Sequence, residues 1–253
     1  MRSQNAHLIL GIDVGGSGVK GAVVDVRKGT LVTDRYRLKT PEPADPKSVA
    51  QVVARIVRHF KWRGPVGCGM PGPIKHGRIP ILSNLDKSWI GADVAEVYSK
   101  ACGCRVTVIN DADAAGLAEM RFGAGRKKSG VVVLTTFGTG IGTAVFVDSR
   151  LVPNTEFGQM EINGKPAEAR ASARVRKARD LSWKAWGERV NTYLLALENV
   201  LWPDLIIVGG GVSRKASRFL PRITTKAQVV PAKFRNEAGI VGAALAAASR
   251  DKP

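Results

Sequence analysis

The residues with the clearest chemical potential lie in a glycine-rich turn near the start of the chain. An apolar run at residues 8–14 contains Asp13 and leads into the turn Gly15-Gly16-Ser17-Gly18. Glycines let several backbone N–H groups approach one anion closely. Asp13 at a strand end can orient a hydrated Mg²⁺, and Lys20 can add positive charge. Alone, this turn fits either a phosphate site or an ordinary hairpin.

Two later segments have the same design. The predicted strand 131–136 runs into Gly138, Thr139 and Gly140, and the apolar run 205–208 runs into Gly209, Gly210 and Gly211. Strand, glycine-rich turn and strand occur twice, at 8–26 and at 131–147, which indicates a duplicated motif. Because each turn follows a strand, as phosphate-binding turns require, we interpret the three together as a phosphate site.

A carboxylate suited to proton transfer follows another predicted strand. A strand is predicted at residues 106–109, and Asn110-Asp111-Ala112-Asp113 come directly after it. A hydroxyl that attacks phosphorus must lose its proton, and a carboxylate within hydrogen-bond reach can accept it. We therefore take Asp111 as the candidate general base. One of Asp111 and Asp113 can also cap the helix that follows, and both interpretations can hold.

Several polar side chains stand in otherwise apolar or glycine-rich surroundings: Asn84, Glu156, Gln159 and Glu168. Amide and carboxylate groups that converge on one spot suit sugar hydroxyls, because each hydroxyl both donates and accepts a hydrogen bond. Taken singly, each is an ordinary surface residue.

These candidates need elements to position them. Beyond the strands above, we expect a strand at 31–38, a helix at 49–60 with Ser48 as a possible cap, and a short buried strand at 65–68. Helical patterns follow at 112–122, 172–200 and 238–249. Mixed strands and helices with a duplicated motif predict an α/β protein of two lobes with a cleft between them.

Composition narrows the functional classes. The 253 residues are 44% hydrophobic and 24% charged, which excludes a disordered or collagen-like chain. A net charge of +18 attracts polyanions such as nucleic acid, acidic lipid or phosphate chains. Three cysteines are too few for a disulfide scaffold.

No apolar run reaches the roughly 18 residues of a membrane span, and no signal peptide is evident. We therefore expect a cytoplasmic enzyme or binding protein.

Several motifs together resemble the ROK family of sugar kinases: residues 10–21 (LGIDVGGSGVKG), 110–121 (NDADAAGLAEMR) and 137–142 (FGTGIG). Four more resemble its polyphosphate glucokinase branch, which includes the polyphosphate/ATP glucomannokinases: residues 83–91 (SNLDKSWIG), 152–156 (VPNTE), 181–184 (LSWK) and 203–213 (PDLIIVGGGVS). The similarity runs from about residue 8 to residue 247, nearly the whole chain.

This resemblance implies the actin-like ATPase fold, which is hexokinase-type and ribonuclease H-like. It implies a small N-terminal lobe at 1–109, a large C-terminal lobe at 110–253, and a last helix at about 237–250 that packs back on the first lobe. It also implies a homodimer that uses Mg²⁺. The implied reaction transfers a phosphoryl group from inorganic polyphosphate, with ATP as a further donor, to the 6-hydroxyl of glucose or a related hexose such as mannose.

The family's functional residues can be carried over position by position. Asp111 matches the catalytic base, and Asp13 matches the acid near Mg²⁺ and the phosphates. The phosphate loops correspond to Gly15, Gly16, Ser17, Lys20, Gly138, Thr139 and Gly140. The turn near the adenosine of ATP corresponds to Gly209, Gly210 and Gly211. The sugar contacts correspond to Asn84, Asn110, Asp111, Glu156 and Glu168.

Two departures from the family pattern matter. Relatives usually carry Glu-x-Gly-His, whereas this chain has Glu156-Phe157-Gly158-Gln159. Gln159 still donates and accepts hydrogen bonds, so it stays a sugar-contact candidate, with hexose affinity and specificity left open. The zinc-binding cysteine cluster of many ROK proteins is missing, as it is in the polyphosphate branch, and we expect no structural zinc.

Other functions stay open on sequence alone. An ATP-preferring ROK hexokinase shares the fold, and Gln159 motivates a non-catalytic binder of sugar or polyphosphate. A DNA-binding ROK regulator needs an N-terminal helix-turn-helix, and only about seven residues precede the first strand. We therefore expect a hexose with polyphosphate or ATP as ligands, and neither nucleic acid nor a membrane.

The positive charge is unevenly placed. Residues 165–191 contain Lys165, Arg170, Arg174, Arg176, Lys177, Arg179, Lys184 and Arg189 against only Glu168, Asp180 and Glu188. A solvated basic surface is the simpler interpretation. The sharper hypothesis is that some of these side chains line a groove that holds a long polyanion while its end reacts. On that hypothesis, charge reversal at Arg174 and Arg176 raises the KM for long polyphosphate more than the KM for ATP.

Overall fold

The structure is a computed structural model that describes residues 7–80 and 86–249, and its contacts divide the chain into two compact units. Unit 1 comprises residues 1–118 and 237–253, and unit 2 comprises residues 119–236. The division falls after Ala118 and not after residue 109. The reason is that a Cβ atom on Gly242, in the last helix, would overlap the carbonyl oxygen of Ala114, so the preceding segment packs with unit 1.

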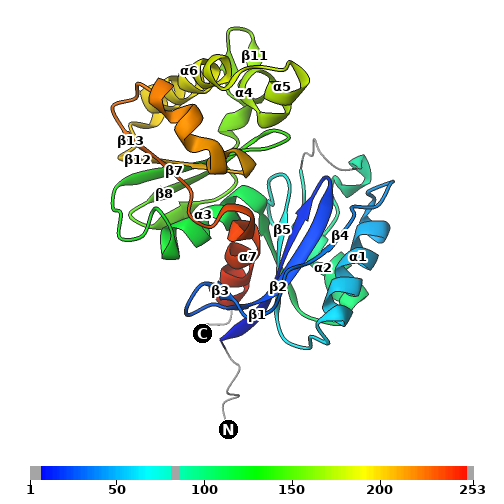
Figure 1. Ribbon diagram of the computed structural model, residues 1–253. Coiled ribbons are helices and arrows are strands. Elements are labelled where there is room, and N and C mark those ends of the chain that lie inside the picture. Colours follow the sequence, from blue (N-terminus) through cyan, green and yellow to red (C-terminus); the bar gives the residue numbers. More distant parts are fainter. Residues whose placement is uncertain (1–6, 81–85, 250–253) are drawn as a thin grey trace. The chain divides into compact units, whose positions relative to one another are not determined.

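Unit 1 is a mixed sheet with helices on it (Figure 1). Its strands are β1 (Leu8–Gly15), β2 (Gly18–Asp25), β3 (Thr30–Leu31), β4 (Tyr36–Leu38), β5 (Val66–Met70) and β6 (Val106–Asn110). Their order is β3-β2-β1-β5-β6, with β4 also paired to β2. The helices are α1 (Pro46–His59), α2 (Val94–Cys102), α3 (Asp111–Phe122, which continues into unit 2), α7 (Ala238–Ser249) and the 3-10 helix η1 (Lys87–Trp89).

The period-two alternation of β1 decides which helices its side chains reach. Leu10 and Ile12 are fully buried in the same core as α1 and α2. Gly11 faces the other way, where a Cβ atom would overlap the carbonyl oxygen of Ile240 in α7. This close approach needs glycine in the strand. Asp13, two residues on, shares the α7 face of the sheet.

Two predictions in unit 1 were wrong in detail. The N-cap of α1 is Asp45, whose Oδ1 accepts from the Ser48 nitrogen at 2.9 Å, so Ser48 is not the cap. Pro46 fits the first helical position because its missing N–H would be unpaired there anyway. The expected strand 31–38 is split into β3 and β4, because the Val23 N–H donates to the Thr33 hydroxyl at 3.0 Å and not to a ladder carbonyl.

Unit 2 repeats the sheet topology of unit 1. Its main strands are β7 (Val131–Phe137), β8 (Ile141–Val147), β9 (Arg150–Val152), β12 (Leu205–Gly209) and β13 (Gln228–Pro231), in the order β13-β12-β7-β8-β9. In each unit the first strand pairs antiparallel with the second and parallel with a later strand. The predicted α/β fold with a duplicated sheet motif is confirmed.

The remaining elements of unit 2 lie outside this main sheet. They are the hairpin β10 (Glu161–Ile162) and β11 (Lys165–Pro166), the helices α4 (Glu168–Ala171), α5 (Ala173–Ala178) and α6 (Trp183–Leu201), and the 3-10 helices η2 (Phe157–Gln159), η3 (Gly211–Arg218), η4 (Leu220–Arg222) and η5 (Arg235–Glu237, which ends in unit 1). Within the described ranges, no helix combines the length and apolarity that a bilayer crossing requires.

The basic region expected to be helical over 172–200 is interrupted. Helix α5 ends at Ala178, and α6 begins after its own cap, Ser182, whose hydroxyl accepts from the Ala185 nitrogen at 3.1 Å. Between them Asp180 has φ of 43°, which a helix cannot contain. Helix α6 then packs Trp186 and Tyr193 edge-on against Phe137 of β7. The core of unit 2 thus anchors the strand that leads into the second glycine turn.

Candidate active site

The carboxyl ends of three parallel strands meet at one edge of the unit 1 sheet. β1, β5 and β6 are neighbours, with Asp13 paired to Gly69 and Met70 paired to Asn110. A Cβ atom on Gly69 would lie 3.7 Å from the Cα of Asp111 and 3.8 Å from the carbonyl oxygen of Ile12. Asp13 and Asp111 therefore border the same glycine. The strands that lead to them, β1 and β6, lie on either side of β5 and are thus about 10 Å apart.

The Asp13 carboxylate lies in a positive environment. Its Oδ2 is 2.8 Å from Nζ of Lys20, its cross-strand partner. Gly239, in the first turn of α7, faces it so closely that a Cβ atom there would lie 2.7 Å from Oδ2. A helix N-terminus carries partial positive charge, so α7 and Lys20 both place positive charge beside the Asp13 carboxylate.

Mg²⁺ fits this carboxylate. The ion keeps several waters and is usually held by one or two carboxylates plus substrate phosphates. The Asp13 side chain is 15% exposed at the sheet edge, so it can hold such a hydrated ion. In the part of the chain that the structure describes, no three His, Cys, Asp or Glu side chains gather into an all-protein metal site.

The first glycine turn is held by two residues that the sequence did not single out. The Arg37 guanidinium donates to the carbonyl oxygen of Ser17 at 2.9 Å, and the Thr40 hydroxyl donates to that of Gly15 at 2.5 Å. Among the described residues, nothing accepts from the N–H groups of Gly16 and Ser17, and both residues are exposed. Hydrogen bonds thus hold the carbonyl groups of this turn in place, and its exposed N–H groups are suited to bind an anion.

Asn110 begins α3. Its Oδ1 accepts from the Asp113 nitrogen at 2.9 Å, and its Nδ2 donates to the carbonyl oxygen of Gly72 at 3.0 Å. The idea that Asp111 or Asp113 caps this helix was therefore wrong, since Asn110 supplies the cap. Asp111 stands in the first helical turn, directly after β6 and half-buried. The bonds of Asn110 fix the chain direction at the point where Asp111 leaves the strand.

In unit 2 the second and third glycine turns lie together. Gly210 has φ of 78°, and a Cβ atom there would overlap the carbonyl oxygen of Phe137, the last residue of β7. The turn 209–211 therefore touches the strand end that leads into Gly138 and Gly140. No group in the described residues accepts from the Thr139 N–H, and Thr139 is exposed.

Glu168 lies against this second turn. Its Oε2 accepts from the Ile141 nitrogen at 3.2 Å, and a Cβ atom on Gly140 would overlap the same carboxylate oxygen. The structure thus gives Glu168 a role in holding the turn, which the sequence did not indicate. Its predicted contact with sugar stays a prediction.

Glu156 precedes the short helix η2, and Gln159 is the last residue of that helix. A Cβ atom on Gly158 would overlap the Ile141 carbonyl oxygen, so η2 packs at the start of β8, next to the glycine turn. Gln159 is exposed and Glu156 half-buried. The Tyr193 phenol is buried. Its burial, together with a smaller effect of the Glu156 charge, raises the pKa of Tyr193 well above the usual value, so the phenol stays neutral.

The structure therefore brings together two groups of predicted residues, one in each unit. Unit 1 gathers Asp13, Lys20, the first glycine turn, Asn110 and Asp111. Unit 2 gathers the other two glycine turns, Glu156, Gln159 and Glu168. Asn84, predicted as a sugar contact, lies outside the described residues.

Known proteins similar to this chain agree with the motifs. The ROK family model matches residues 9–163. Polyphosphate glucokinase of Mycobacterium tuberculosis (strain H37Rv) is 51% identical over 237 residues, covering 93% of this chain and 89% of that protein. Polyphosphate glucokinase of Mycobacterium leprae is 47% identical over 241 residues, covering 95% and 74%. The crystal structure of inorganic polyphosphate/ATP-glucomannokinase from Arthrobacter sp. strain KM matches with a TM-score of 0.93 and 46% identity, covering 96% of this chain and 99% of that one.

Proposed function

The chain belongs to the ROK family and has its actin-like ATPase fold, and we propose that it is a hexokinase that transfers a phosphoryl group from inorganic polyphosphate to the 6-hydroxyl of glucose. The observation that carries the reaction is the placement of Asp111 and Asp13 beside Gly69, at the edge that also holds the first glycine turn. The choice of donor and acceptor is supported by the two mycobacterial polyphosphate glucokinases, at 51% and 47% identity.

Asp111 is the proposed general base. Its half-buried carboxylate leaves the strand at a point fixed by the two bonds of Asn110. It accepts the proton that the 6-hydroxyl loses as its oxygen attacks the terminal phosphorus, while the shortened polyphosphate leaves. Positioning and electrostatics supply the rate, and no covalent intermediate with the protein is required.

The phosphate chain is held by backbone N–H groups and by charge. Gly16 and Ser17 in unit 1 and Thr139 in unit 2 present exposed N–H groups that suit phosphate oxygens. We propose that Asp13 holds a hydrated Mg²⁺. When bound, this ion neutralises negative charge on the donor phosphates. Lys20 orients the Asp13 carboxylate through their 2.8 Å ion pair and adds a positive charge at the same edge.

The proposed sugar contacts are Asn84, Asn110, Glu156, Gln159 and Glu168. The side chain of Asn110 already makes two bonds within the protein, which leaves its second amide hydrogen and the remaining lone pair of its oxygen for a hydroxyl. Gln159 offers an amide where relatives usually carry histidine, and it is exposed. It donates and accepts without the charge change of an imidazole, so we expect hexose binding that varies little with pH near neutrality.

A second donor and a second acceptor have specific support. The Arthrobacter protein, at 46% identity, is a polyphosphate/ATP-glucomannokinase. We therefore propose ATP as an alternative donor, with Gly209–Gly211 near its adenosine, and mannose as an alternative acceptor. We also expect a homodimer, which sedimentation would detect as twice the 27.0 kDa mass of the chain.

One assay tests the proposed function. The purified protein is incubated with Mg²⁺, with glucose, mannose or another hexose, and with polyphosphate or ATP, and the hexose 6-phosphate formed is measured. We expect turnover of glucose with polyphosphate. Absence of turnover with every hexose, alongside intact binding of sugar, would instead support a non-catalytic binder. Turnover with ATP alone would identify an ATP-dependent hexokinase.

A further inference from the structure

Helix α5 is attached to the second glycine turn. The Arg174 nitrogen donates to the carbonyl oxygen of Gly138 at 3.0 Å, so the first turn of the helix begins at that loop. Ser172 caps α5 and is fully buried, which fixes where the helix starts. With six residues at about 1.5 Å each, α5 extends about 9 Å from the loop. Its sequence, ARVRKA, is half basic.

The basic residues of this region separate into two groups by what they touch. Arg176 lies 4.1 Å from the ring centre of Trp183 and donates to the carbonyl oxygen of Leu181, and Arg189 donates to that of Arg170. These two arginines serve the packing of α5 and α6. Arg174 and Lys177 are exposed and, three residues apart, share one face of α5. Because Arg176 is engaged in this packing, we take Arg174 and Lys177 as the side chains best placed to contact a polyanion.

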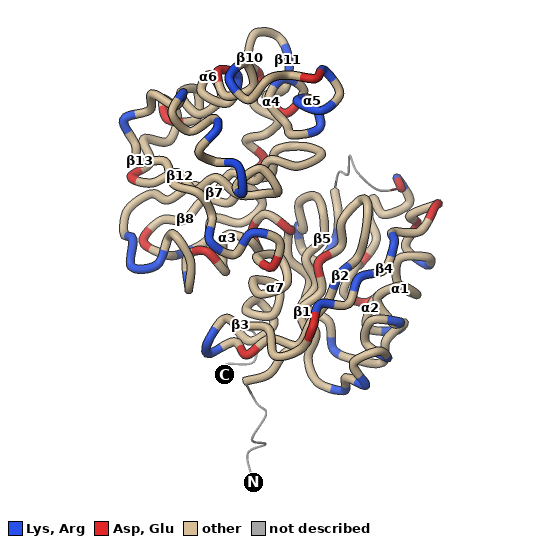
Figure 2. The backbone as a smooth tube through the Cα atoms, in the orientation of Figure 1, with Lys and Arg blue, Asp and Glu red and all other residues tan. Residues whose placement is uncertain are grey.

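This exposed face is not paired with acidic side chains among the described residues. Across residues 7–80 and 86–249, no ion pair involves a lysine or arginine of the segment 165–191. Glu168, the acid closest in sequence to the start of α5, is engaged with the Ile141 nitrogen. Figure 2 shows the resulting concentration of basic residues along α5.

We propose that the α5 face formed by Arg174 and Lys177, called here the α5 basic face, binds the inorganic polyphosphate chain beyond the phosphate that reacts. The inference rests on the proposed function and deepens it, since it assigns where the unreacted part of the donor lies. A chain whose end lies on the Gly138–Gly140 turn reaches the α5 basic face directly, because the Arg174 backbone is bonded to that turn. A short donor ends before it.

The surroundings of α5 favour inorganic polyphosphate over nucleic acid. Proteins that bind single-stranded nucleic acid stack bases on exposed aromatic rings. Helix α5 has no aromatic residue. Trp183, the neighbouring aromatic, is covered by Arg176 at 4.1 Å and stacked with Phe219 at 6.1 Å between ring centres. Charge without a stacking surface suits a ligand made of phosphate alone.

The test compares a double charge reversal on α5 with a matched reversal elsewhere. The test variant is Arg174→Glu with Lys177→Glu. The control is Arg55→Glu with Arg58→Glu, which changes two exposed cations with the same spacing on α1, the second of them again in the last helical turn. For each protein the KM is measured for long-chain polyphosphate and for the shortest polyphosphate that the wild type uses. Binding of labelled long-chain polyphosphate without sugar is followed by fluorescence anisotropy.

We expect the test variant to raise the KM for long-chain polyphosphate about tenfold and to weaken its direct binding by a similar factor. The KM for the short donor should change less than about twofold, and the control should change neither. Added salt should weaken long-chain binding in the wild type more than in the test variant.

Equal effects on long and short donors, or equal effects of the two variants, would overturn the proposal. Tighter binding of single-stranded DNA than of polyphosphate, lost in the same variant, would reassign the face to nucleic acid. If the wild type shows no polyphosphate-dependent turnover, the proposed function fails. The anisotropy comparison then decides by itself whether the α5 basic face binds the polymer.

Discussion

The Thr143 hydroxyl donates to the carbonyl oxygen of Thr155 at 2.7 Å, from a side chain that is 1% exposed. The Thr143 hydroxyl oxygen also accepts from the Phe157 nitrogen at 3.1 Å. One hydroxyl on β8 therefore holds the residues on both sides of Glu156. Thr143 is a positioning residue for the proposed sugar contact, and it belongs to no motif of the sequence.

Replacement of Thr143 tests that role. Thr143→Val keeps the shape but leaves the Phe157 N–H and the Thr155 carbonyl without their partner, which costs about 1–3 kcal/mol of stability. We expect the KM for glucose to rise about tenfold while the KM for polyphosphate stays within about twofold. Thr143→Ser keeps the hydroxyl and should restore the KM for glucose. A valine variant with less stability but an unchanged KM for glucose would contradict the positioning role.

Gly210 and Gly211 offer a matched pair in the third glycine turn. Gly210 has φ of 78° and a backbone carbonyl in the place of a Cβ atom, whereas nothing lies within 4 Å of a Cβ atom on Gly211. Gly210→Ala should lower the free energy of unfolding by about 2 kcal/mol or more, and Gly211→Ala by less than about 0.5 kcal/mol. Urea denaturation of both variants measures the difference. Equal losses would mean that the contact with Phe137 is not as tight as described.

Asn110 should matter for stability as well as for the site. Asn110→Ala removes the cap of α3 and the bond to the Gly72 carbonyl, and we expect a loss of about 2 kcal/mol in the free energy of unfolding. Asn110→Ser keeps a capping hydroxyl and should recover about half of it. Chemical denaturation gives both values. An alanine variant as stable as the wild type would indicate that Asp111 or Asp113, and not Asn110, caps the helix.

The elements that the sequence predicted well are those set by local pattern. The strand before Asp13 and the turn after it follow from an apolar run and adjacent glycines, and β7 with its turn follows in the same way. The N-cap of α1 was not predicted correctly from local pattern. Apolar spacing defines the body of a helix, whereas the choice between Asp45 and Ser48 as the cap depends on backbone geometry.

The parts of the site that escaped prediction depend on pairing between distant segments. Arg37 and Thr40 reach the first glycine turn across 20 and 25 residues, because β4 pairs with β2. Thr143 reaches Thr155 through the fold of η2 onto β8. None of these residues has an unusual type or spacing, so no sequence signal marked them. The sequence pattern that comes closest to such a signal is a polar residue on a strand predicted to lie opposite a glycine turn.

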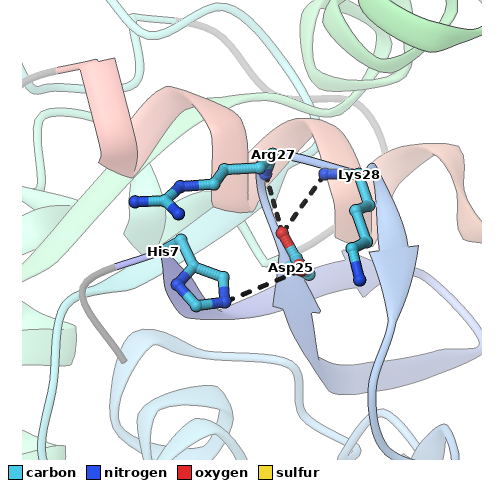
Figure 3. Close-up of polar contacts among 4 residues, drawn as sticks. All are labelled: His7, Asp25, Arg27 and Lys28. Carbon is cyan, nitrogen blue, oxygen red and sulfur yellow. Dashed lines mark hydrogen bonds and ion pairs between the residues drawn. The ribbon is translucent and has the colours of Figure 1, made fainter. Parts of the chain in front are cut away.

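Asp25 predicts a specific dependence of stability on pH. Burial raises its pKa, but the backbone N–H groups of Arg27 and Lys28, at 2.9 and 3.2 Å, together with His7 at 3.7 Å, bring the pKa below the ordinary value of 3.8 (Figure 3). A carboxyl whose pKa is lower in the folded protein stabilises it above the unfolded pKa, and the stabilisation is lost as the pH falls through the folded value.

Asp25→Asn should therefore be less stable than the wild type at pH 7, and the gap should close below about pH 3.8. Asp34→Asn, at an exposed carboxylate, provides the control and should show no such gap. Thermal denaturation between pH 7 and pH 3 measures both. A gap that stays constant across this range would show that the ionisation of Asp25 does not stabilise the fold.

The most direct test of the central claim is the turnover of Asp111 variants with glucose, polyphosphate and Mg²⁺. Asp111→Asn and Asp111→Ala remove the proton acceptor, and circular dichroism and denaturation show whether each variant is folded. We predict that kcat falls by about 10³-fold or more in both folded variants. Residual turnover within about tenfold of the wild type in either folded variant would contradict the assignment of Asp111 as the general base.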